Sequence, residues 1–241
     1  MKKTCVITGG SSGIGRAITA LFIDNGYNVY NLDISQSDLG IYLECNITDH
    51  ESVHQHIDNI AKNGPIDVLI TSAGIHFSAN IEDTSEQDLQ RVFDINVKGA
   101  YSAVQAVLPN MKKYNSGSII ILASDQALVA KPNSFAYNLS KNALASLAKT
   151  TAIDYAKYNI RANALCPGTI ETPLYHKAIE HYCDVSGSDI NEVHKSEAQM
   201  QPLARLGQPQ EVAHYALFLA SDNASFITGS TPVIDGGYTT G

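Results

Sequence analysis

The sequence has few basic residues for its length. Its 241 residues include 16 lysines and arginines against 24 aspartates and glutamates, a formal net charge of −8. A large nucleic-acid-binding surface needs clustered basic side chains to neutralise phosphates. The charge balance therefore argues against DNA or RNA as a partner. It leaves a nucleotide cofactor open, because N–H groups at a helix start can bind a pyrophosphate without many basic side chains.

Cysteines and long apolar runs are also scarce. No apolar stretch approaches the ~20 residues of a membrane-spanning helix, and the run that follows Lys3 is too short for a signal peptide. We therefore expect a cytoplasmic protein with no membrane partner, whose cysteines stay reduced. The cysteines match neither a CxxC metal pair nor a disulfide framework; they are Cys5, Cys45, Cys166 and Cys183.

The chain alternates short apolar strands with amphipathic helices and has no repeats or low-complexity segments. Strands are expected at 4–8, 27–33, 41–45, 66–71, 118–123, 160–166 and 231–234, and helices at 13–25, 49–63, 86–113, 134–158 and 210–220. The run Ile119–Leu122 is apolar on both faces, as in a parallel sheet that is covered on both sides. The pattern predicts an α/β fold: a single doubly wound Rossmann-type domain over residues 1–241, with a central parallel sheet of about seven strands and helices on both faces.

Two connections depart from this alternation. Residues 35–40 are too few for a crossover helix, so we expect a short loop between two parallel strands. Residues 168–207 show no regular pattern and are interpreted as an irregular insertion. Long insertions in compact domains are typically functional, and we expect this one to cover the substrate as a lid.

A glycine-rich turn joins the first strand to the first helix, Thr8-Gly9-Gly10-Ser11-Ser12-Gly13-Ile14-Gly15. Its spacing is GxxxGxG, not GxGxxG, but its position indicates a site where helix N–H groups bind a pyrophosphate. Asp33 ends the second strand, where a carboxylate can accept hydrogen bonds from the adenosine ribose and repel the 2′-phosphate of NADP. No basic residue stands at 10–12 to offset that repulsion. We therefore predict NAD as cofactor, in preference to NADP.

Tyr137 and Lys141 are four residues apart on a predicted helix and so share one face. A tyrosine titrates near pH 10 in water. A positive charge ~4 Å away, at an effective dielectric of ~20, is worth about 4 kcal/mol. That would lower the pKa of the Tyr137 phenol by about three units. The pair therefore predicts a general acid/base active near neutral pH.

The motifs together resemble the short-chain dehydrogenase/reductase family, from Thr4 to Tyr238. In order they are Thr8-Gly-x-x-x-Gly-Ile-Gly15, Ser72-Ala73-Gly74 in place of Asn-Ala-Gly, Asn96, Ser124, Tyr137-x-x-x-Lys141 and Pro167-Gly168. The joint signal is specific, although each element alone is not. Two departures stand out. Asn46 occupies a position that is often Asp in the family, and Thr71-Ser72 replaces an Asn-Asn pair that braces the central strands.

The resemblance implies a catalytic set of Asn96, Ser124, Tyr137 and Lys141. Tyr137 would exchange a proton with the substrate oxygen, and Lys141 would lower its pKa and hold the nicotinamide ribose. Ser124 would hydrogen-bond the substrate oxygen, and Asn96 would support a water in a proton relay with Lys141. The implied cofactor contacts are Gly9, Ser12, Gly13, Ile14, Asp33, Asn46, Ala73, Gly74, Tyr137, Lys141, Pro167, Gly168, Ile170 and Thr172.

We therefore predict NAD-dependent hydride transfer between a nicotinamide cofactor and a secondary alcohol/ketone pair. Polar residues near the expected site favour a polar small-molecule substrate such as a sugar or hydroxy acid; they are His76, Asp125, Gln126 and Asn138. A 3-oxoacyl thioester reductase is the alternative within the enzyme class. A non-enzymatic NAD-binding regulator is the alternative outside it, but binding alone does not require all four catalytic residues.

Two further features bear on partners and metals. The helical segments 97–111 and 139–156 are more apolar than exposed helices usually are, which favours a homo-oligomer, and family resemblance implies a tetramer. His50 and His54 share a helix face, but no third ligand accompanies them. We therefore predict no metal site.

Overall fold

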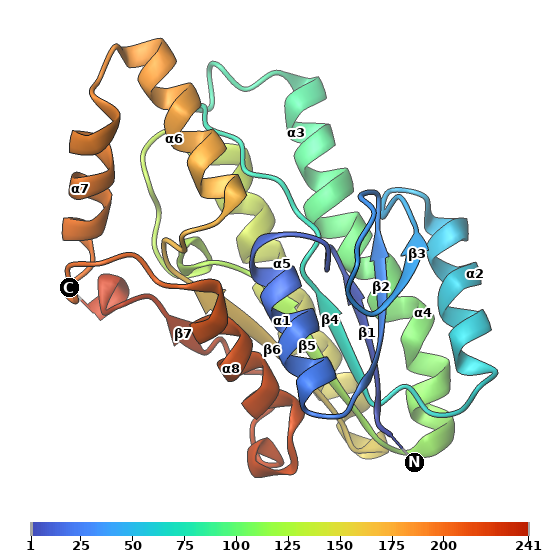
Figure 1. Ribbon diagram of the computed structural model, residues 1–241. Coiled ribbons are helices and arrows are strands. Elements are labelled where there is room, and N and C mark those ends of the chain that lie inside the picture. The colour runs from blue at the N-terminus through green and yellow to red at the C-terminus, as the bar shows by residue number, and fades with distance from the viewer. Residues whose placement is uncertain (1, 241) are drawn as a thin grey trace.

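A central parallel sheet organises the computed structural model, which describes residues 2–240 (Figure 1). The strand order is β3-β2-β1-β4-β5-β6-β7, and each strand pairs in parallel with its neighbours. The strands are β1 (Thr4–Thr8), β2 (Asn28–Asp33), β3 (Ile41–Glu44), β4 (Val68–Thr71), β5 (Gly117–Leu122), β6 (Ile160–Pro167) and β7 (Val233–Ile234). This confirms the expected doubly wound α/β fold.

Helices cover both faces of the sheet. They are α1 (Gly13–Asp24), α2 (His50–Ala61), α3 (Glu86–Phe93), α4 (Gly99–Tyr114), α5 (Phe135–Tyr155), α6 (Pro173–Ser186), α7 (Ile190–Met200) and α8 (Pro209–Ala220). Alternate strand residues feed two separate cores, as the period of a strand requires. Ile7 and Ile120 pack with α1 and α8, whereas Val6 and Ile119 pack with α2, α4 and α5. The apolar runs of the sequence thus belong to strands buried on both faces. No helix within residues 2–240 is long and apolar enough to span a membrane.

Two of the expected elements are corrected. The segment 168–207 is not irregular, because α6 and α7 occupy most of it. Thr172 caps α6 by accepting a hydrogen bond from the Tyr175 N–H at 3.1 Å, and Asp189 caps α7 in the same way. The expected helix 86–113 is interrupted at Asp94–Lys98 by a π-helical turn. Such turns occur frequently at functional sites, and this one carries Asn96.

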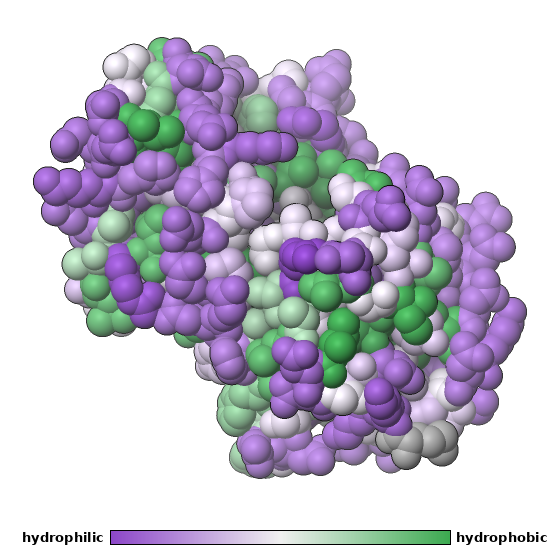
Figure 2. All heavy atoms as spheres, in the orientation of Figure 1, coloured by the Kyte–Doolittle hydropathy of each residue, from purple (hydrophilic) through white to green (hydrophobic). Residues whose placement is uncertain are grey.

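The topology places the site at one edge of the sheet. From β1 the chain runs outward to β2 and β3, then returns to β4 on the other side of β1. Ligands of open α/β sheets bind beyond the carboxyl ends of the strands at such a switch point. The helices α6 and α7 project above this edge (Figure 1). In the space-filling view, apolar side chains appear in the hollow between them and the rest of the domain (Figure 2).

Candidate functional site

The glycine turn after β1 has a geometry that only glycines allow. Gly9 has φ +72°, and a Cβ there would lie 2.5 Å from the backbone nitrogen of Ala73. A Cβ on Gly15 would overlap the carbonyl oxygen of Gly9. Ser12 precedes α1 without capping it through its side chain, and the first turn has no acidic residue. The turn therefore presents uncapped helix N–H groups in a cradle that fits a dinucleotide pyrophosphate.

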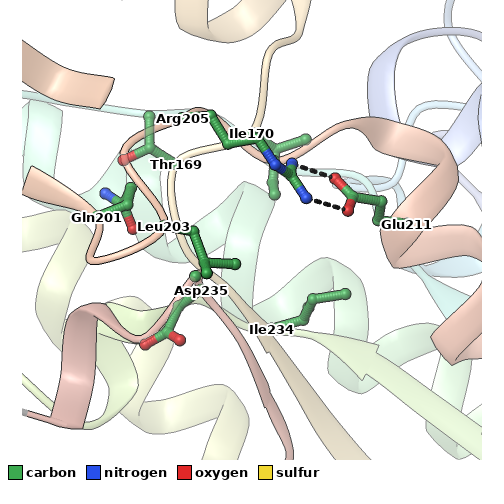
Figure 3. Close-up of a pocket in the computed structure, with 10 residues that line it drawn as sticks. Thr169, Ile170, Gln201, Leu203, Arg205, Glu211, Ile234 and Asp235 are labelled. Atoms are coloured by element: carbon green, nitrogen blue, oxygen red, sulfur yellow. Dashed lines mark hydrogen bonds and ion pairs between the residues drawn. The ribbon is translucent and has the colours of Figure 1, made fainter. Parts of the chain in front are cut away.

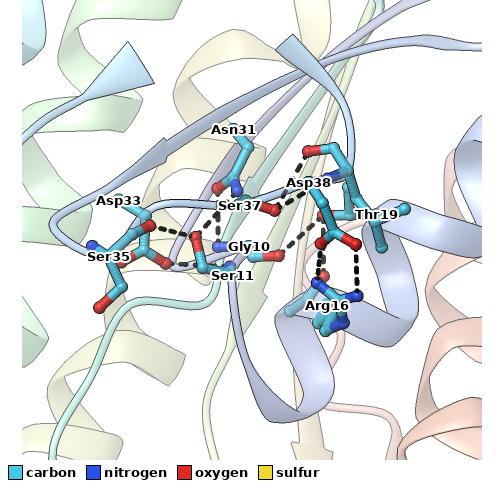
Figure 4. A network of polar contacts seen from close by, with 11 residues as sticks. Gly10, Ser11, Arg16, Thr19, Asn31, Asp33, Ser35, Ser37 and Asp38 are labelled. Carbon is cyan, nitrogen blue, oxygen red and sulfur yellow. Dashed lines mark hydrogen bonds and ion pairs between the residues drawn. The ribbon is translucent and has the colours of Figure 1, made fainter. Parts of the chain in front are cut away.

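Two polar side chains of β2 hold this turn in place (Figure 4). The amide oxygen of Asn31 accepts the Gly10 N–H at 3.0 Å. The carboxylate of Asp33 accepts the N–H groups of Ser11 at 3.0 Å and Ser35 at 2.9 Å. Asp33 thus braces the turn as well as placing a negative charge beside it. The bracing role of Asn31 was missed from the sequence, because an interior strand residue gives no sign of the loop it faces.

Arg16 lies on the first turns of α1 and is paired with Asp38 in the loop 35–40. Its guanidinium nitrogens lie 2.6 and 3.2 Å from the two carboxylate oxygens of Asp38 (Figure 4). The Asp38 carboxylate in turn raises the pKa of Arg16. The loop that sequence analysis expected between β2 and β3 therefore supplies a counter-ion for the basic residue nearest to the expected adenosine ribose.

Ser124, Tyr137 and Lys141 come together beyond β5. Ser124 is the second residue after β5 and opens a short 3₁₀ turn. Tyr137 and Lys141 lie on the first turns of α5, and the Lys141 ammonium is 5.4 Å from the Tyr137 ring centroid. Lys141 is buried and donates to the carbonyl oxygen of Leu122 at 3.0 Å. The structure thus brings the reactive pair of the sequence motif onto one helix face.

The expected lowering of the Tyr137 pKa is wrong for the protein chain by itself. Tyr137 keeps some surface exposure, but the surrounding protein desolvates its hydroxyl and raises its pKa, with Ser124 acting in the opposite direction and Asp125 adding to the rise. Burial also lowers the pKa of Lys141 to about 8. The spacing was correct, but burial penalises the charged form of each group.

Asn96 is committed to bracing the site. Its amide oxygen accepts the Ile75 N–H at 2.8 Å, and its amide nitrogen donates to the Ile75 carbonyl and the Ser140 hydroxyl, both at 3.0 Å. A Cβ on Gly74 would lie 3.2 Å from the amide oxygen of Asn96. Asn96 therefore ties the loop after β4 to α5. Its predicted part in a proton relay with Lys141 stays a prediction.

The remaining predicted cofactor contacts are distributed around the same edge. Ala73 lies against Gly9, and Thr172 lies against Gly13, where a Cβ would be 3.4 Å away. Pro167 ends β6, and Gly168 packs on Asp235. Ile170 forms an isolated β-bridge with Gly207. Ser12 and Ile14 lie on either side of Gly13, the first residue of α1. Asn46 is exposed and accepts from the N–H and hydroxyl of Thr48 at 3.1 and 2.9 Å. The amide oxygen of Asn46, one of the implied cofactor contacts, thus already accepts hydrogen bonds within its own loop.

Two of the polar residues that suggested a polar substrate brace the protein instead. The amide oxygen of Gln126 accepts the Ser134 hydroxyl at 2.6 Å, and Asn138 donates to the Gln126 carbonyl at 2.7 Å. His76 does lie at the reactive phenol, with its ring edge-on to Tyr137 at 4.8 Å between centroids. Burial and two nearby lysines lower the pKa of His76, so its ring stays neutral at physiological pH.

The segment 168–207 has a closed base. Glu171 donates its N–H to the Gly207 carbonyl at 2.9 Å, and Gly207 donates to the Thr169 carbonyl at 3.0 Å. Farther out, the Tyr175 hydroxyl lies 2.8 Å from a ring nitrogen of His194 and couples α6 to α7. The two helices thus leave and rejoin the domain at one point. That this segment covers the substrate as a lid stays a prediction.

A cavity of about 80 Å³ lies under this base (Figure 3). Its lining includes Gln201 and Asp235, and Arg205 pairs with Glu211 at its edge at 2.7 Å. None of the catalytic set lines it. Within residues 2–240, no three His, Cys, Asp or Glu side chains gather to hold a metal ion.

A parallel sheet with a glycine cradle at its switch point and a Tyr–Lys pair beside it defines a dinucleotide-dependent oxidoreductase. The model of the family described as Enoyl-(Acyl carrier protein) reductase matches residues 9–239. The chain belongs to the short-chain dehydrogenase/reductase family, and its named relatives are oxidoreductases that act on CH–OH groups.

Three relatives cover 98% of this chain. Oxidoreductase UcpA of Salmonella typhimurium is 38% identical, with 94% of its length covered. 3-oxoacyl-[acyl-carrier-protein] reductase FabG of Thermotoga maritima is 36% identical, with 97% covered. 2-keto-3-deoxy-L-fuconate dehydrogenase of Xanthomonas campestris pv. campestris is 37% identical, with 80% covered.

Two solved structures match the whole chain. Ligand-free aldohexose dehydrogenase of Thermoplasma acidophilum has a TM-score of 0.93 and 39% identity over 95% of its own chain. ElxO with NADP bound has a TM-score of 0.90 and 30% identity over its full length.

Proposed function

We propose that the protein transfers hydride between NAD and a secondary alcohol/ketone pair, with Tyr137 as the proton-transfer residue. The observation that carries the proposal is the convergence of Ser124, Tyr137 and Lys141 beside the Gly9–Gly15 cradle. The bound dinucleotide supplies the hydride acceptor and a cationic ring. Side chains of this protein transfer the proton and stabilise the charge that develops on the substrate oxygen.

In the oxidation direction, Tyr137 takes the proton of the substrate hydroxyl. Burial opposes its ionisation, so positive charge beside the phenol is needed to bring it into a useful range. Lys141 holds part of that charge from one helical turn away. Ser124 lies at the end of β5 and can contact the same oxygen as charge develops on it. Asn96 keeps the loop after β4 against α5, the helix that carries Tyr137 and Lys141.

NAD is the proposed cofactor because of the charges around the end of β2. Asp33 places a carboxylate where a 2′-phosphate would lie. Arg16, the basic residue closest to that position in sequence, already faces Asp38. A relative structure holds NADP, so the choice between the two cofactors rests on these residues of this chain.

A sugar or hydroxy acid is the proposed substrate. The neutral ring of His76 beside Tyr137 offers a hydrogen-bonding edge in the site, and two similar proteins bear the names of sugar or sugar-acid dehydrogenases. The similarity to FabG keeps a 3-oxoacyl thioester as the second candidate. A panel of both substrate types, each assayed with NAD and NADP, separates them by their kcat/KM values.

A cytoplasmic homotetramer completes the proposal. Large apolar side chains are exposed on both long helices: Tyr101 on α4, and Leu139 and Ile153 on α5, with Ile153 78% exposed. Exposed apolar surface favours a subunit interface. The buried Cys5, Cys45 and Cys166 are unpaired, in keeping with a reducing compartment. Light scattering at micromolar concentration tests the assembly, and a monomer there would contradict it.

Tyr137→Phe tests the proton-transfer role directly. The variant keeps the ring and its packing but lacks the hydroxyl, so we expect turnover to fall by about three orders of magnitude or more. NADH affinity, measured by fluorescence titration, should change little. Tyr114→Phe, at an exposed tyrosine on the last turn of α4, is the matched control and should turn over normally. Full turnover in Tyr137→Phe would refute the mechanism.

A further inference from the structure

The hydroxyl of Ser124 already has a strong partner within the protein. It donates to a carboxylate oxygen of Asp125 at 2.6 Å, while the Gln126 N–H donates to the Ser124 oxygen at 3.2 Å. Hydroxyl–carboxylate bonds of this length are among the strong hydrogen bonds in proteins. The Ser124 proton therefore points at Asp125 in this structure. Family resemblance gave no reason to expect an acidic residue in this contact.

Asp125 is a buried carboxylate with a single close counter-ion. Its side chain is 3% exposed, and its second oxygen lies 3.4 Å from the Lys131 ammonium. That oxygen makes no hydrogen bond of good geometry with the described residues. Burying an unpaired carboxylate is costly, and the Lys131 ammonium supplies the opposite charge beside it.

Lys131 contacts Tyr238, a residue close to the carboxyl terminus. Its ammonium lies 4.5 Å from the Tyr238 ring centroid, a favourable cation–π distance. The turn that carries Tyr238 is fixed by Asp235, which accepts hydrogen bonds from the Gly237 and Thr239 N–H groups. A continuous line of contacts thus runs from the carboxyl-terminal turn through Lys131 and Asp125 to Ser124.

We propose that Asp125 and Lys131 are a positioning pair: Asp125 fixes the direction of the Ser124 proton, and Lys131 offsets the negative charge that Asp125 places beside Tyr137. The proposal rests on the proposed function, because it assigns the pair a role in that reaction. Asp125 lies next to Ser124 and raises the pKa of Tyr137. Removing the carboxylate should therefore ease ionisation of the phenol, and removing Lys131 should oppose it.

The other ionisable groups around the pair do not change this sign. His76 stays neutral, since burial and the charges of Lys131 and Lys141 lower its pKa. Burial raises the pKa of Cys166 to about 11, so its thiol is uncharged at physiological pH. The ionisable groups that face the pair are His76, Tyr137, Lys141, Cys166 and Tyr238.

The test is the pH dependence of kcat/KM for alcohol oxidation in Asp125→Asn and Lys131→Met. Oxidation needs the ionised phenol, so the rate rises with pH through an apparent pKa. We expect the midpoint of this rise to move to lower pH in Asp125→Asn and to higher pH in Lys131→Met, each by about half to one unit. Asp222→Asn and Lys3→Met remove the charges of an exposed ion pair at the opposite end of the sheet and should not move it.

A second measurement tests the link through Ser124. If Asp125 acts by directing the Ser124 proton, Ser124→Ala combined with Asp125→Asn should be little slower than Ser124→Ala alone. The pairing would be overturned if the losses in kcat/KM from Ser124→Ala and Asp125→Asn multiplied in the double variant. It would also be overturned if the pH midpoints of Asp125→Asn and Lys131→Met moved in the same direction or did not move. Should Asp125→Asn fail to fold, as judged by circular dichroism, Lys131→Met still decides the sign. If the wild-type chain oxidises no alcohol in the panel, the proposed function fails, and this inference falls with it.

Discussion

The variant Asn96→Ala tests whether Asn96 holds the loop after β4 in place or acts only in the predicted proton relay. Asn96 is 1% exposed and makes three hydrogen bonds, two to the backbone of Ile75 and one to Ser140. Truncation leaves the Ile75 N–H without its partner in a partly buried place. Partial burial puts this orphaned group at the low end of the usual cost, about 1 kcal/mol, and each of the two other bonds contributes about 0.5–1.5 kcal/mol. We therefore expect a loss of about 2–4 kcal/mol in the free energy of unfolding.

The assay combines melting with turnover. For a domain of this size, a loss of 1 kcal/mol lowers Tm by about 2–4 °C, so Asn96→Ala should melt roughly 5–15 °C below the wild type. Turnover measured well below that Tm should also fall, because the loop after β4 is no longer held against α5. A variant with wild-type Tm and poor turnover would refute the bracing role and leave only the relay.

Asn110→Ala is the matched control. Asn110 on α4 is 8% exposed, and its amide accepts the Ile66 N–H at 2.9 Å and donates to the Gly64 carbonyl at 3.0 Å. It braces the loop before β4, at the end of the sheet away from the site. We expect a similar loss of stability with turnover close to normal. Equal loss of turnover in both variants would show that destabilisation alone accounts for the effect at Asn96.

Three further predictions concern the cofactor cradle and the base of the lid. Gly15→Ala forces a Cβ against the Gly9 carbonyl, so the Kd for NADH in a fluorescence titration should rise about tenfold or more; unchanged affinity would show that the turn relaxes freely. Asp33→Asn keeps an acceptor for the Ser11 N–H but removes the charge, so it should raise the ratio of kcat/KM with NADP to kcat/KM with NAD by about tenfold. An unchanged ratio would show that the Asp33 charge does not set the choice of cofactor. Hydrogen bonding with Arg205 lowers the pKa of Glu211 from 4.5 to about 2, so its stabilisation is present above pH 4.5 and lost as pH falls towards 2. The Tm gap between wild type and Glu211→Gln should therefore close over that range, and a constant gap would contradict the ion pair.

The sheet was predictable because its signals are local. Strand positions follow from short apolar runs such as Ile119–Leu122, and the parallel arrangement follows from their being apolar on both faces. The closeness in space of the segments predicted to be catalytic and cofactor-binding could be foreseen for a related reason, since the carboxyl ends of neighbouring parallel strands meet at one edge of the sheet. Sequence distance is large between Gly9 and Ala73, yet both follow strands that pair.

The sequence contains helix-start signals for α6 and α7 that the sequence analysis did not use. Thr172-Pro173 opens α6, and Asp189 with Glu192 opens α7; a capping residue followed by proline or by an acid in the first turn is an ordinary helix start. The π-helical turn at Asp94–Lys98 is different. Its sequence continues a helical pattern, and only the packing of Asn96 against the loop after β4 shows why the helix widens there.

The electrostatics of the site depend on burial, which sequence spacing does not contain. A spacing of four residues places the Tyr137 and Lys141 side chains on one helix face, but it does not say whether water reaches them. In the folded chain Lys141 is buried and turned towards the Leu122 carbonyl, and its own pKa falls to about 8. Burial raises the pKa of Tyr137 even though the Lys141 ammonium lies one helical turn away. The ionisation of Tyr137 must therefore be controlled by the whole set of charges around it, and Asp125 and Lys131 are the members of that set that the motif does not name.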